Sequence, residues 1–286
     1  MLRTRLIVGT ILAALAAGML FLDRYFAPWA PFLFAVVVIL SVFGALELLH
    51  ILPPYRRPRT GVAVIGVIVV VALNWLPLVR HIGRTPPTIG DSWECVAQGF
   101  AAIILAAFLN EMARFVSPGG SIERIALGVW LVGYLAVLPS FLIELHFAQS
   151  ADPALAAVAL ALTIFVPKAC DIGAYFTGRF LGRHRMTPVL SPKKTWEGAI
   201  GGLALAVAVA FGLNRLGPVI PGGLAGVVAF GLTVGVAGML GDLAESLIKR
   251  DCERKDASQM VPGFGGILDV VDSILFAAPV AYWWLT

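Results

Sequence analysis

Long apolar runs recur along the whole chain and are separated by short polar stretches. Most runs have close to the roughly 20 residues that a helix needs to cross a hydrocarbon core of about 30 Å. The apolar positions are continuous and do not alternate with a period of two, which favours helices over barrel strands. The pattern predicts an all-α, polytopic integral membrane protein with about nine transmembrane helices, at Leu6–Leu22, Pro31–Leu52, Thr60–Val79, Cys95–Val116, Ile125–Phe147, Pro153–Ile172, Trp196–Leu213, Val219–Leu240 and Ile267–Leu285.

The composition agrees with this pattern. Only 13% of the 286 residues are charged and 59% are hydrophobic, whereas about a quarter of the residues in a soluble domain are charged. The three cysteines, Cys95, Cys170 and Cys252, are scattered and lack CxxC spacing, so they indicate neither a disulfide framework nor a metal site. The composition therefore argues against a soluble protein.

The positive charge is concentrated in particular loops, which a nine-span arrangement places on the N-terminal side of the membrane. These loops are 56–59, 114–124, 179–194 and 249–255. Because Lys and Arg concentrate in cytoplasmic loops, we expect the N-terminus and these loops to be cytoplasmic, in a cell inner or plasma membrane. The net charge of +4 is then a topology signal, and no nucleic-acid partner is expected. We expect the first run to stay as a span, although Arg3 and Arg5 before it are also typical of a signal peptide.

Polar residues are distributed unevenly between the two halves of the chain. Residues 1–165 are plain apolar spans with ordinary loops, whereas residues 166–276 hold nearly all the polar groups at or inside the ends of spans. We therefore expect residues 1–165 to form a transmembrane scaffold with lipid or oligomer contacts. Residues 166–286 are expected to form the catalytic transmembrane region.

The first polar block runs from Asp171 to Gly198. Lys168 precedes Asp171 by three residues, so the two are helix neighbours. One interpretation is a Lys that extends its amine towards water beside a helix end; the other is an Asp that faces the protein interior, because a carboxylate facing lipid is costly. Glycines in this block allow close backbone approach. The stretch Ser191-Pro192-Lys193-Lys194-Thr195 joins two amines and two hydroxyls before a helix start, which suits a polyphosphate site or is simply a topology signal.

The second and third polar blocks lie near the C-terminus. Asp242, Glu245 and Ser246 share one helix face, which Lys249 continues. Asp269 and Asp272 are again three residues apart, at the start of the last span. Between these two helices a glycine-rich turn, Pro262–Gly266, is expected to bring backbone N–H groups to phosphate oxygens.

Several carboxylates near a membrane surface would repel one another unless a cation lay among them. Such oxygen ligands suit Mg²⁺, which keeps positions for water and substrate phosphates. Carboxylates with Lys and Arg around them are typical of transfer at phosphorus, where catalysis is mostly positioning and charge stabilisation. Two alternatives remain at this point, namely Asp–Lys pairs that only join helices, and an ion-coupled transporter, because acids inside a membrane also line ion paths.

Together the blocks resemble the phosphatidate cytidylyltransferase (CDP-diacylglycerol synthase) family. The C-terminal pattern S-x-x-K-R-x4-K-D-x-S-x2-V-P-G-F-G-G-I-x-D-x-V-D is similar to the family signature, as are S-P-K-K-T-W-E-G and D-x-G-A-Y-F-x-G-R. The resemblance covers residues 166–276. It implies condensation of CTP with phosphatidic acid to CDP-diacylglycerol and pyrophosphate, by in-line attack of the lipid phosphate on the α-phosphorus of CTP.

The resemblance also implies roles for individual residues. It implies a catalytic set of Asp171, Asp242, Ser246, Lys249 and Asp269. It implies metal ligation by Asp242, Asp269 and Asp272, with Mg²⁺ and a companion K⁺. Substrate-binding residues would be Ser191, Lys193, Lys194, Thr195, Arg250, Lys255, Asp256, Gly265 and Gly266. The partners would be CTP, phosphatidic acid and the lipid bilayer, and a homodimer follows from resemblance alone.

The chain departs from the family pattern at two functional positions. Phe264 stands where the family usually has His, and Val270 stands where it usually has Arg; Val261 is a milder change. Three rivals remain, namely a CTP-dependent enzyme on another lipid, such as a polyprenol kinase, an ion-coupled transporter, and an inactive scaffold, which the departures at Phe264 and Val270 leave open. The kinase would attack the γ-phosphorus and release CDP.

Overall fold

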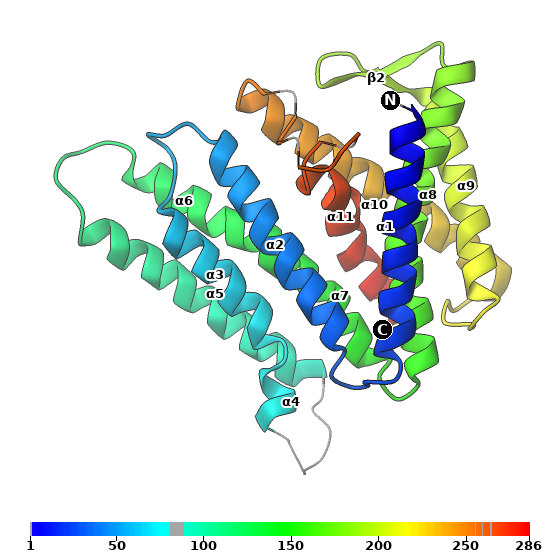
Figure 1. Cartoon of the computed structure of the whole chain (residues 1–286), viewed down its shortest axis with the longest axis horizontal. Coiled ribbons are helices and arrows are strands. Elements are labelled where there is room, and N and C mark those ends of the chain that lie inside the picture. Colours follow the sequence, from blue (N-terminus) through cyan, green and yellow to red (C-terminus); the bar gives the residue numbers. More distant parts are fainter. Residues whose placement is uncertain (1, 81–88, 255, 259, 264) are drawn as a thin grey trace.

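The computed structural model describes residues 2–80, 89–254, 256–258, 260–263 and 265–286. It is a bundle of long helices that run up and down alternately (Figure 1). The helices are α1 (Leu2–Asp23), α2 (Pro31–Ile51), α3 (Thr60–Leu73), α4 (Leu76–Arg80), α5 (Ile89–Met112), α6 (Ser121–Val132), a π-helical turn η1 (Gly133–Val137), α7 (Leu138–Ala148), α8 (Pro153–Leu181), α9 (Trp196–Asn214), α10 (Gly223–Asp251) and α11 (Leu268–Leu285). The predicted all-α membrane fold is confirmed.

Seven helices in the described part of the chain are long and apolar enough to cross a membrane. One of them is continuous through α6, η1 and α7, Ser121–Ala148, and the first apolar helix (Ile7–Asp23) and α3 are shorter than the rest. Each predicted span coincides with one apolar helical segment, but the number nine is not confirmed, because two of these segments fall short of the length of a span.

Two helices extend well beyond their predicted ends. We expected spans ending at Ile172 and Leu240, whereas α8 and α10 continue to Leu181 and Asp251. Each has 29 residues and is therefore about 44 Å long at 1.5 Å per residue. That length exceeds a hydrocarbon core of about 30 Å. The polar side chains at one end of each helix are therefore held by the helix itself and not by a loop.

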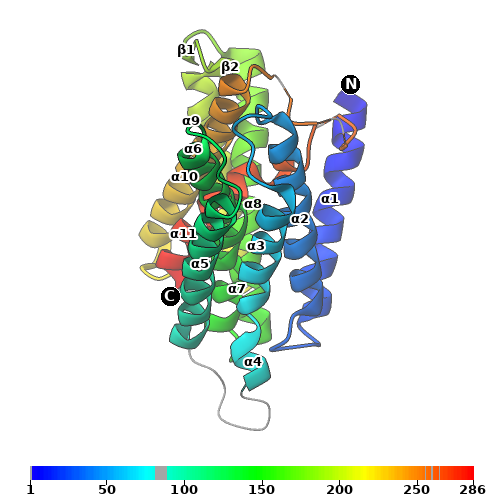
Figure 2. The same cartoon turned by 90° about the vertical axis from the view of Figure 1, so that its left-hand side faces the viewer.

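The stretch between α8 and α9 contains the only strands in the described residues. β1 (Arg185–Thr187) and β2 (Ser191–Thr195) pair as an antiparallel hairpin, with Arg185 opposite Thr195. We expected this segment to be a loop. The hairpin lies at the same end of the bundle as the N-terminus (Figure 2).

The basic loops also gather at that end. The connections α2–α3, α5–α6, β1–β2 and α10–α11 all lie at the end where the N-terminus lies (Figures 1 and 2). The four predicted basic loops lie in or directly beside these connections, so their placement at one end of the bundle is confirmed.

Small residues allow the helices of the second half to pack closely. A Cβ at Gly173 of α8 would lie 2.9 Å from the carbonyl oxygen of Gly201 in α9, and one at Gly202 would lie 2.6 Å from that of Cys170. Close approach of this kind is how helices associate where lipid removes the hydrophobic driving force. The predicted role of the glycines after Asp171 in close backbone approach is therefore confirmed at Gly173.

Candidate active site

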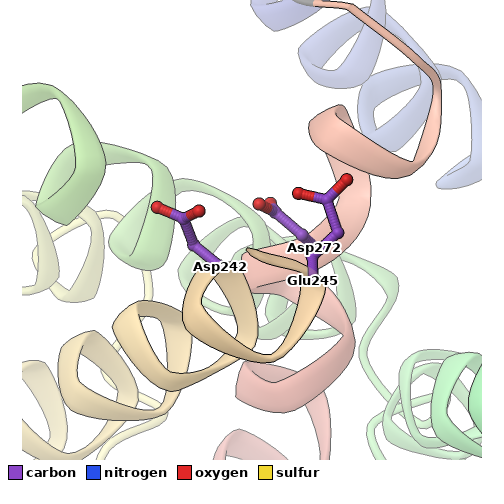
Figure 3. A group of neighbouring side chains, drawn as sticks. All are labelled: Asp242, Glu245 and Asp272. Carbon is purple, nitrogen blue, oxygen red and sulfur yellow. The ribbon is translucent and has the colours of Figure 1, made fainter. Parts of the chain in front are cut away.

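Three carboxylates from two helices meet near the basic end of the bundle. Asp242 and Glu245 of α10 and Asp272 of α11 each place a carboxylate oxygen within 4.8 Å of the others (Figure 3). Glu245 is 1% exposed and Asp272 is 5% exposed. Asp242 and Glu245 are three residues apart, so one helical turn presents both to the same neighbour.

Gly241 explains how α10 and α11 come close enough for this. A Cβ at Gly241 would collide with the backbone carbonyl group of Asp272. The residue before Asp242 therefore packs directly on the backbone of the residue that supplies the third carboxylate. The absence of a side chain at Gly241 is what allows the three acids to converge.

Three lysines surround these acids, each from a different element. Lys168 of α8 lies 3.1 Å from Asp272 and 3.5 Å from Asp171 (Nζ to carboxylate oxygen). Lys194 of β2 lies 2.9 Å from Asp242. The hairpin thus brings one of its two adjacent lysines to the acidic group, and the predicted binding of phosphate by these lysines stays a prediction.

The third lysine, Lys249 of α10, is largely buried. Its amine lies 2.7 Å from Glu245 and 2.6 Å from Asp269. The second oxygen of Asp269 accepts the backbone N–H of Gly266 at 2.7 Å. Asp269 therefore anchors Lys249 and the start of α11, and it lies outside the group of three neighbouring carboxylates that we expected it to join.

Asp171 joins the same network from α8. Its carboxylate accepts a hydrogen bond from the Ser273 hydroxyl at 3.0 Å, and the side chain is 30% exposed. Lys168 pairs with two acids here, so its amine does not simply extend towards water. Asp171 faces the protein, as its interior interpretation predicted.

The other predicted site residues that the structure describes have local partners or are at least partly exposed to solvent. Thr195 caps α9 by accepting the N–H of Gly198, Lys193 is exposed, and Ser246 lies one turn after Asp242 on α10. Arg250 is exposed and donates to the carbonyl oxygen of Arg254. Asp256 is exposed and Ser191 is partly exposed. Their roles in substrate binding stay predictions.

The glycine-rich turn has internal partners for its backbone. Gly265 has a φ of 118°, which favours glycine, and exchanges hydrogen bonds with Val261. The N–H groups of Gly265 and Gly266 thus already have acceptors, so the predicted contact with phosphate stays untested. Lys255 and Phe264, which the sequence also singled out, lie outside the described residues.

Three residues have contacts at this site that the sequence pattern does not assign. The spacing of Glu245 places it on a helix face without indicating that it joins the acidic group, and the spacing of Lys168 fits two interpretations. Glu47 of α2 was not noticed, yet its carboxylate accepts hydrogen bonds from Ser258 and from the backbone of Ile267 and Leu268. A lone carboxylate inside a long apolar run was the available signal, because such groups are costly in lipid.

The charges at the site are suited to a cation. In the described residues, five carboxylates are joined by ion pairs or direct proximity to three amines, which leaves a formal charge of −2 if all are ionised. One oxygen of Glu245, Oε1, is buried and has no hydrogen-bond partner among the described residues. A buried, unpaired carboxylate oxygen is expensive, so the donor set fits a hard cation that takes oxygen ligands.

Comparisons with known proteins point to a family whose reaction is transfer at phosphorus, as this arrangement of acids and amines suggests. A model of the cytidylyltransferase family matches residues 3–286. A phosphatidate cytidylyltransferase of Haemophilus influenzae is 33% identical over 183 residues, which are 62% of this chain and 62% of that protein. A chloroplastic phosphatidate cytidylyltransferase of Arabidopsis thaliana is 35% identical over 240 residues, 74% of this chain and 60% of that protein.

A third relative matches over a shorter stretch. The phosphatidate cytidylyltransferase of Brucella suis is 46% identical over 112 residues, 39% of this chain and 41% of that protein. The chain thus matches these three relatives over less than two thirds of their length, whereas the family model extends over nearly all of the chain. The chain belongs to the cytidylyltransferase family.

Proposed function

We propose that the protein is a phosphatidate cytidylyltransferase, which condenses CTP with phosphatidic acid to give CDP-diacylglycerol and pyrophosphate. The observation that carries the proposal is the convergence of Asp242, Glu245 and Asp272 beside Lys194 and Lys249. Acids and amines in this arrangement suit transfer at phosphorus, where the protein mainly positions groups and balances charge. The names of the relatives support the substrate pair.

The acidic group is where we place a divalent cation. Asp242, Glu245 and Asp272 would hold Mg²⁺, and K⁺ is the companion cation that the family resemblance suggests. Bound Mg²⁺ would polarise phosphoryl oxygens and neutralise the negative charge that develops during transfer. Metal ligation by Asp269 stays a prediction, since both of its oxygens have partners inside the protein.

The amines would hold the substrate phosphates. Lys194 and Lys249 each pair with a carboxylate at the rim of the acidic group, so a phosphate that enters there meets amines already in position. Lys193 and Arg250 are exposed beside them and would extend the positive surface for CTP. The lipid phosphate is the nucleophile, and it is already ionised at neutral pH, so no general base is required for its attack.

The location of the site suits a lipid substrate. The acids lie on helices that are long enough to cross the bilayer and to project beyond it, so acyl chains stay in lipid while the headgroup meets water-soluble CTP. We place this end in the cytoplasm because the basic loops gather there. Residues 166–286 would form the catalytic region and residues 1–165 the supporting scaffold, with a homodimer as a further proposal from the family resemblance.

A direct experiment is pyrophosphate release by the detergent-purified protein with CTP, phosphatidic acid and Mg²⁺. Asp242→Asn and Asp272→Asn are expected to lower the rate at least about a hundredfold, because even residues that only support metal ligands change activity tenfold to a hundredfold. Val189→Cys, at the exposed tip of the hairpin, is the control and is expected to keep the wild-type rate. Release that continues unchanged in both Asp variants would contradict this assignment of the site.

A further inference from the structure

Glu47 belongs to the first half of the chain, yet its side chain ends at the start of α11. It lies near the end of α2 and is 4% exposed. Its Oε1 accepts hydrogen bonds from the Ser258 hydroxyl at 2.6 Å and from the Ile267 N–H at 2.9 Å. Its Oε2 accepts the Leu268 N–H at 2.9 Å. A carboxylate buried in this way has all of its partners in the segment that leads into the site.

This carboxylate does what an N-cap residue normally does. The first N–H groups of a helix have no partner in the helix, and an oxygen-bearing side chain at the N-cap usually accepts one of them. The N-cap of α11 is Ile267, whose side chain makes no such bond. Glu47 supplies the acceptor from 220 positions earlier in the sequence. Its negative charge at the positive end of the helix dipole adds to the interaction.

Gly266 leaves room for this carboxylate because it has no side chain. A Cβ at that position would lie 2.5 Å from Oε2 of Glu47 and 2.9 Å from its Cδ. The glycine in the turn before α11 therefore leaves the space that Glu47 occupies. Ser258 extends the same contact to the earlier part of the loop, so one carboxylate holds both the loop and the start of the helix.

The start of α11 determines where the acids of that helix point. Asp269 follows Leu268 directly, and Asp272 comes less than one turn later. Rotating α11 by one residue would turn Asp272 by about 100° away from Asp242 and Glu245. The orientation of Asp272 therefore depends on where the first N–H groups of α11 are held.

We propose that Glu47 is a positioning residue of the active site, which sets the start and rotation of α11 and thereby the cation affinity of Asp242, Glu245 and Asp272. The inference rests on the proposed function for the cation at this group. It also assigns a site role to the half of the chain that the sequence presented as plain scaffold. Glu47 contacts neither substrate nor cation in this account and acts through α11.

The test measures Mn²⁺ binding to the purified full-length protein, without substrates, from the electron paramagnetic resonance signal of free Mn²⁺. Glu47→Gln keeps the shape of the side chain but replaces one acceptor oxygen by an NH₂ group that faces a donor. We expect a tenfold to hundredfold loss of Mn²⁺ affinity, the usual range for groups that orient metal ligands (about 10–100-fold). Glu144→Gln is the matched control, because the side chain of Glu144 in α7 is fully buried and makes no hydrogen bond among the described residues. The Mn²⁺ affinity of this variant is expected to equal that of the wild type.

A second variant protects the test against misfolding. Ser258→Ala removes only one of the three hydrogen bonds to Glu47, and we expect a smaller loss of Mn²⁺ affinity in the same direction. Hydrogen–deuterium exchange is expected to become faster at residues 265–270 in both variants. Wild-type affinity in Glu47→Gln, or in Ser258→Ala if the first variant does not fold, overturns the inference, as does a wild type that binds no Mn²⁺. Weakened Mn²⁺ binding in a protein that makes no CDP-diacylglycerol would instead overturn the proposed function alone.

Discussion

At the scale of single residues, the site consists of carboxylates and amines. Burying any of them alone would cost much free energy, and burying them as pairs costs less. Lys249 shows this most clearly, since its amine lies between Glu245 and Asp269 and all three groups are largely removed from water. Taking charges out of water costs several kcal/mol for each ion, and good geometry is needed to offset it. Each charged residue here therefore depends on its partners.

Replacing Lys249 tests that dependence. Lys249→Met leaves Glu245 and Asp269 without their shared cation, and removing one partner of a buried pair costs about 3–5 kcal/mol. We expect a clear drop in the thermal unfolding midpoint of the purified protein, measured by intrinsic fluorescence. Lys193→Met is the control. Its free energy of unfolding is expected to stay within about 0.5 kcal/mol of that of the wild type, as is usual for substitutions at exposed positions, so its unfolding midpoint should hardly change. An unchanged midpoint in Lys249→Met would show that the pairs contribute little.

The residue scale also shows what a sequence can reveal about such a site. The spacing of Asp242, Glu245 and Lys249 places them on one helix face, and that prediction holds. Spacing alone could not place Asp272 beside them, because this depends on how two helices pack; only the family resemblance grouped Asp272 with Asp242. Spacing along a helix also does not tell that Glu245 lies beside Asp242 and Asp272 while Asp269 pairs with Lys249.

At the scale of elements, the length of α8 and α10 and the contact between α10 and α11 matter most. Hydropathy ended both predicted spans where polar residues begin, although both helices continue for further turns. In α10 some of the polar side chains of these turns pair with other protein groups, as Asp242 does with Lys194. Hydropathy registers what lipid would accept and does not register partners inside the protein. The start of α11 was close to its prediction, but its cap comes from another helix and has no local signal at Ile267.

Gly241→Ala tests the helix contact itself. The added methyl group would meet the backbone of Asp272, and α10 and α11 would have to separate, at a cost of about 1–3 kcal/mol. We expect a lower unfolding midpoint together with weaker Mn²⁺ binding, because the three acids would move apart.

Gly212→Ala in α9 is the matched control, since a Cβ there would meet nothing within 4 Å. Alanine is the better helix former by about 1 kcal/mol, so this variant is expected to be as stable as the wild type or more so. If Gly241→Ala behaves like Gly212→Ala in both measurements, close contact at Gly241 is not what assembles the site.

At the scale of the whole molecule, the bundle presents one polar and basic end and one plainer end. The apolar pattern and the placement of Lys and Arg together were sufficient to predict this arrangement, because each apolar run has to lie in lipid and the chain has to return through the membrane after each span. The division into scaffold and catalytic halves stays a prediction, and in our proposal the first half also reaches the site, through the contacts of Glu47 with the loop and α11. The apolar pattern gives no information on contacts between distant helices.

The proposed orientation is open to chemical labelling. In a variant without the three native cysteines, Val189→Cys lies on the hairpin, 93% exposed, and Leu216→Cys lies after α9, 76% exposed. A membrane-impermeant maleimide is expected to label the first only in inverted vesicles and the second only in intact spheroplasts. Labelling of both from one side would contradict the up-and-down arrangement, and a full reversal would place the site away from cytoplasmic CTP.

The central claim is that the acidic group supports transfer of the cytidylyl group to a lipid, and the position of a label decides it most directly. Purified protein would be incubated with phosphatidic acid, Mg²⁺ and CTP labelled with radioactive phosphorus at either the α- or the γ-phosphate. We expect the α-label to enter the lipid fraction and the γ-label to be released as pyrophosphate. Both the labelling of lipid and the release of pyrophosphate are expected to be lost in Asp272→Asn. Entry of the γ-label into lipid would identify a kinase. If the wild-type protein binds Mn²⁺, which shows that its site is intact, but transfers no label to lipid, the proposed reaction is contradicted.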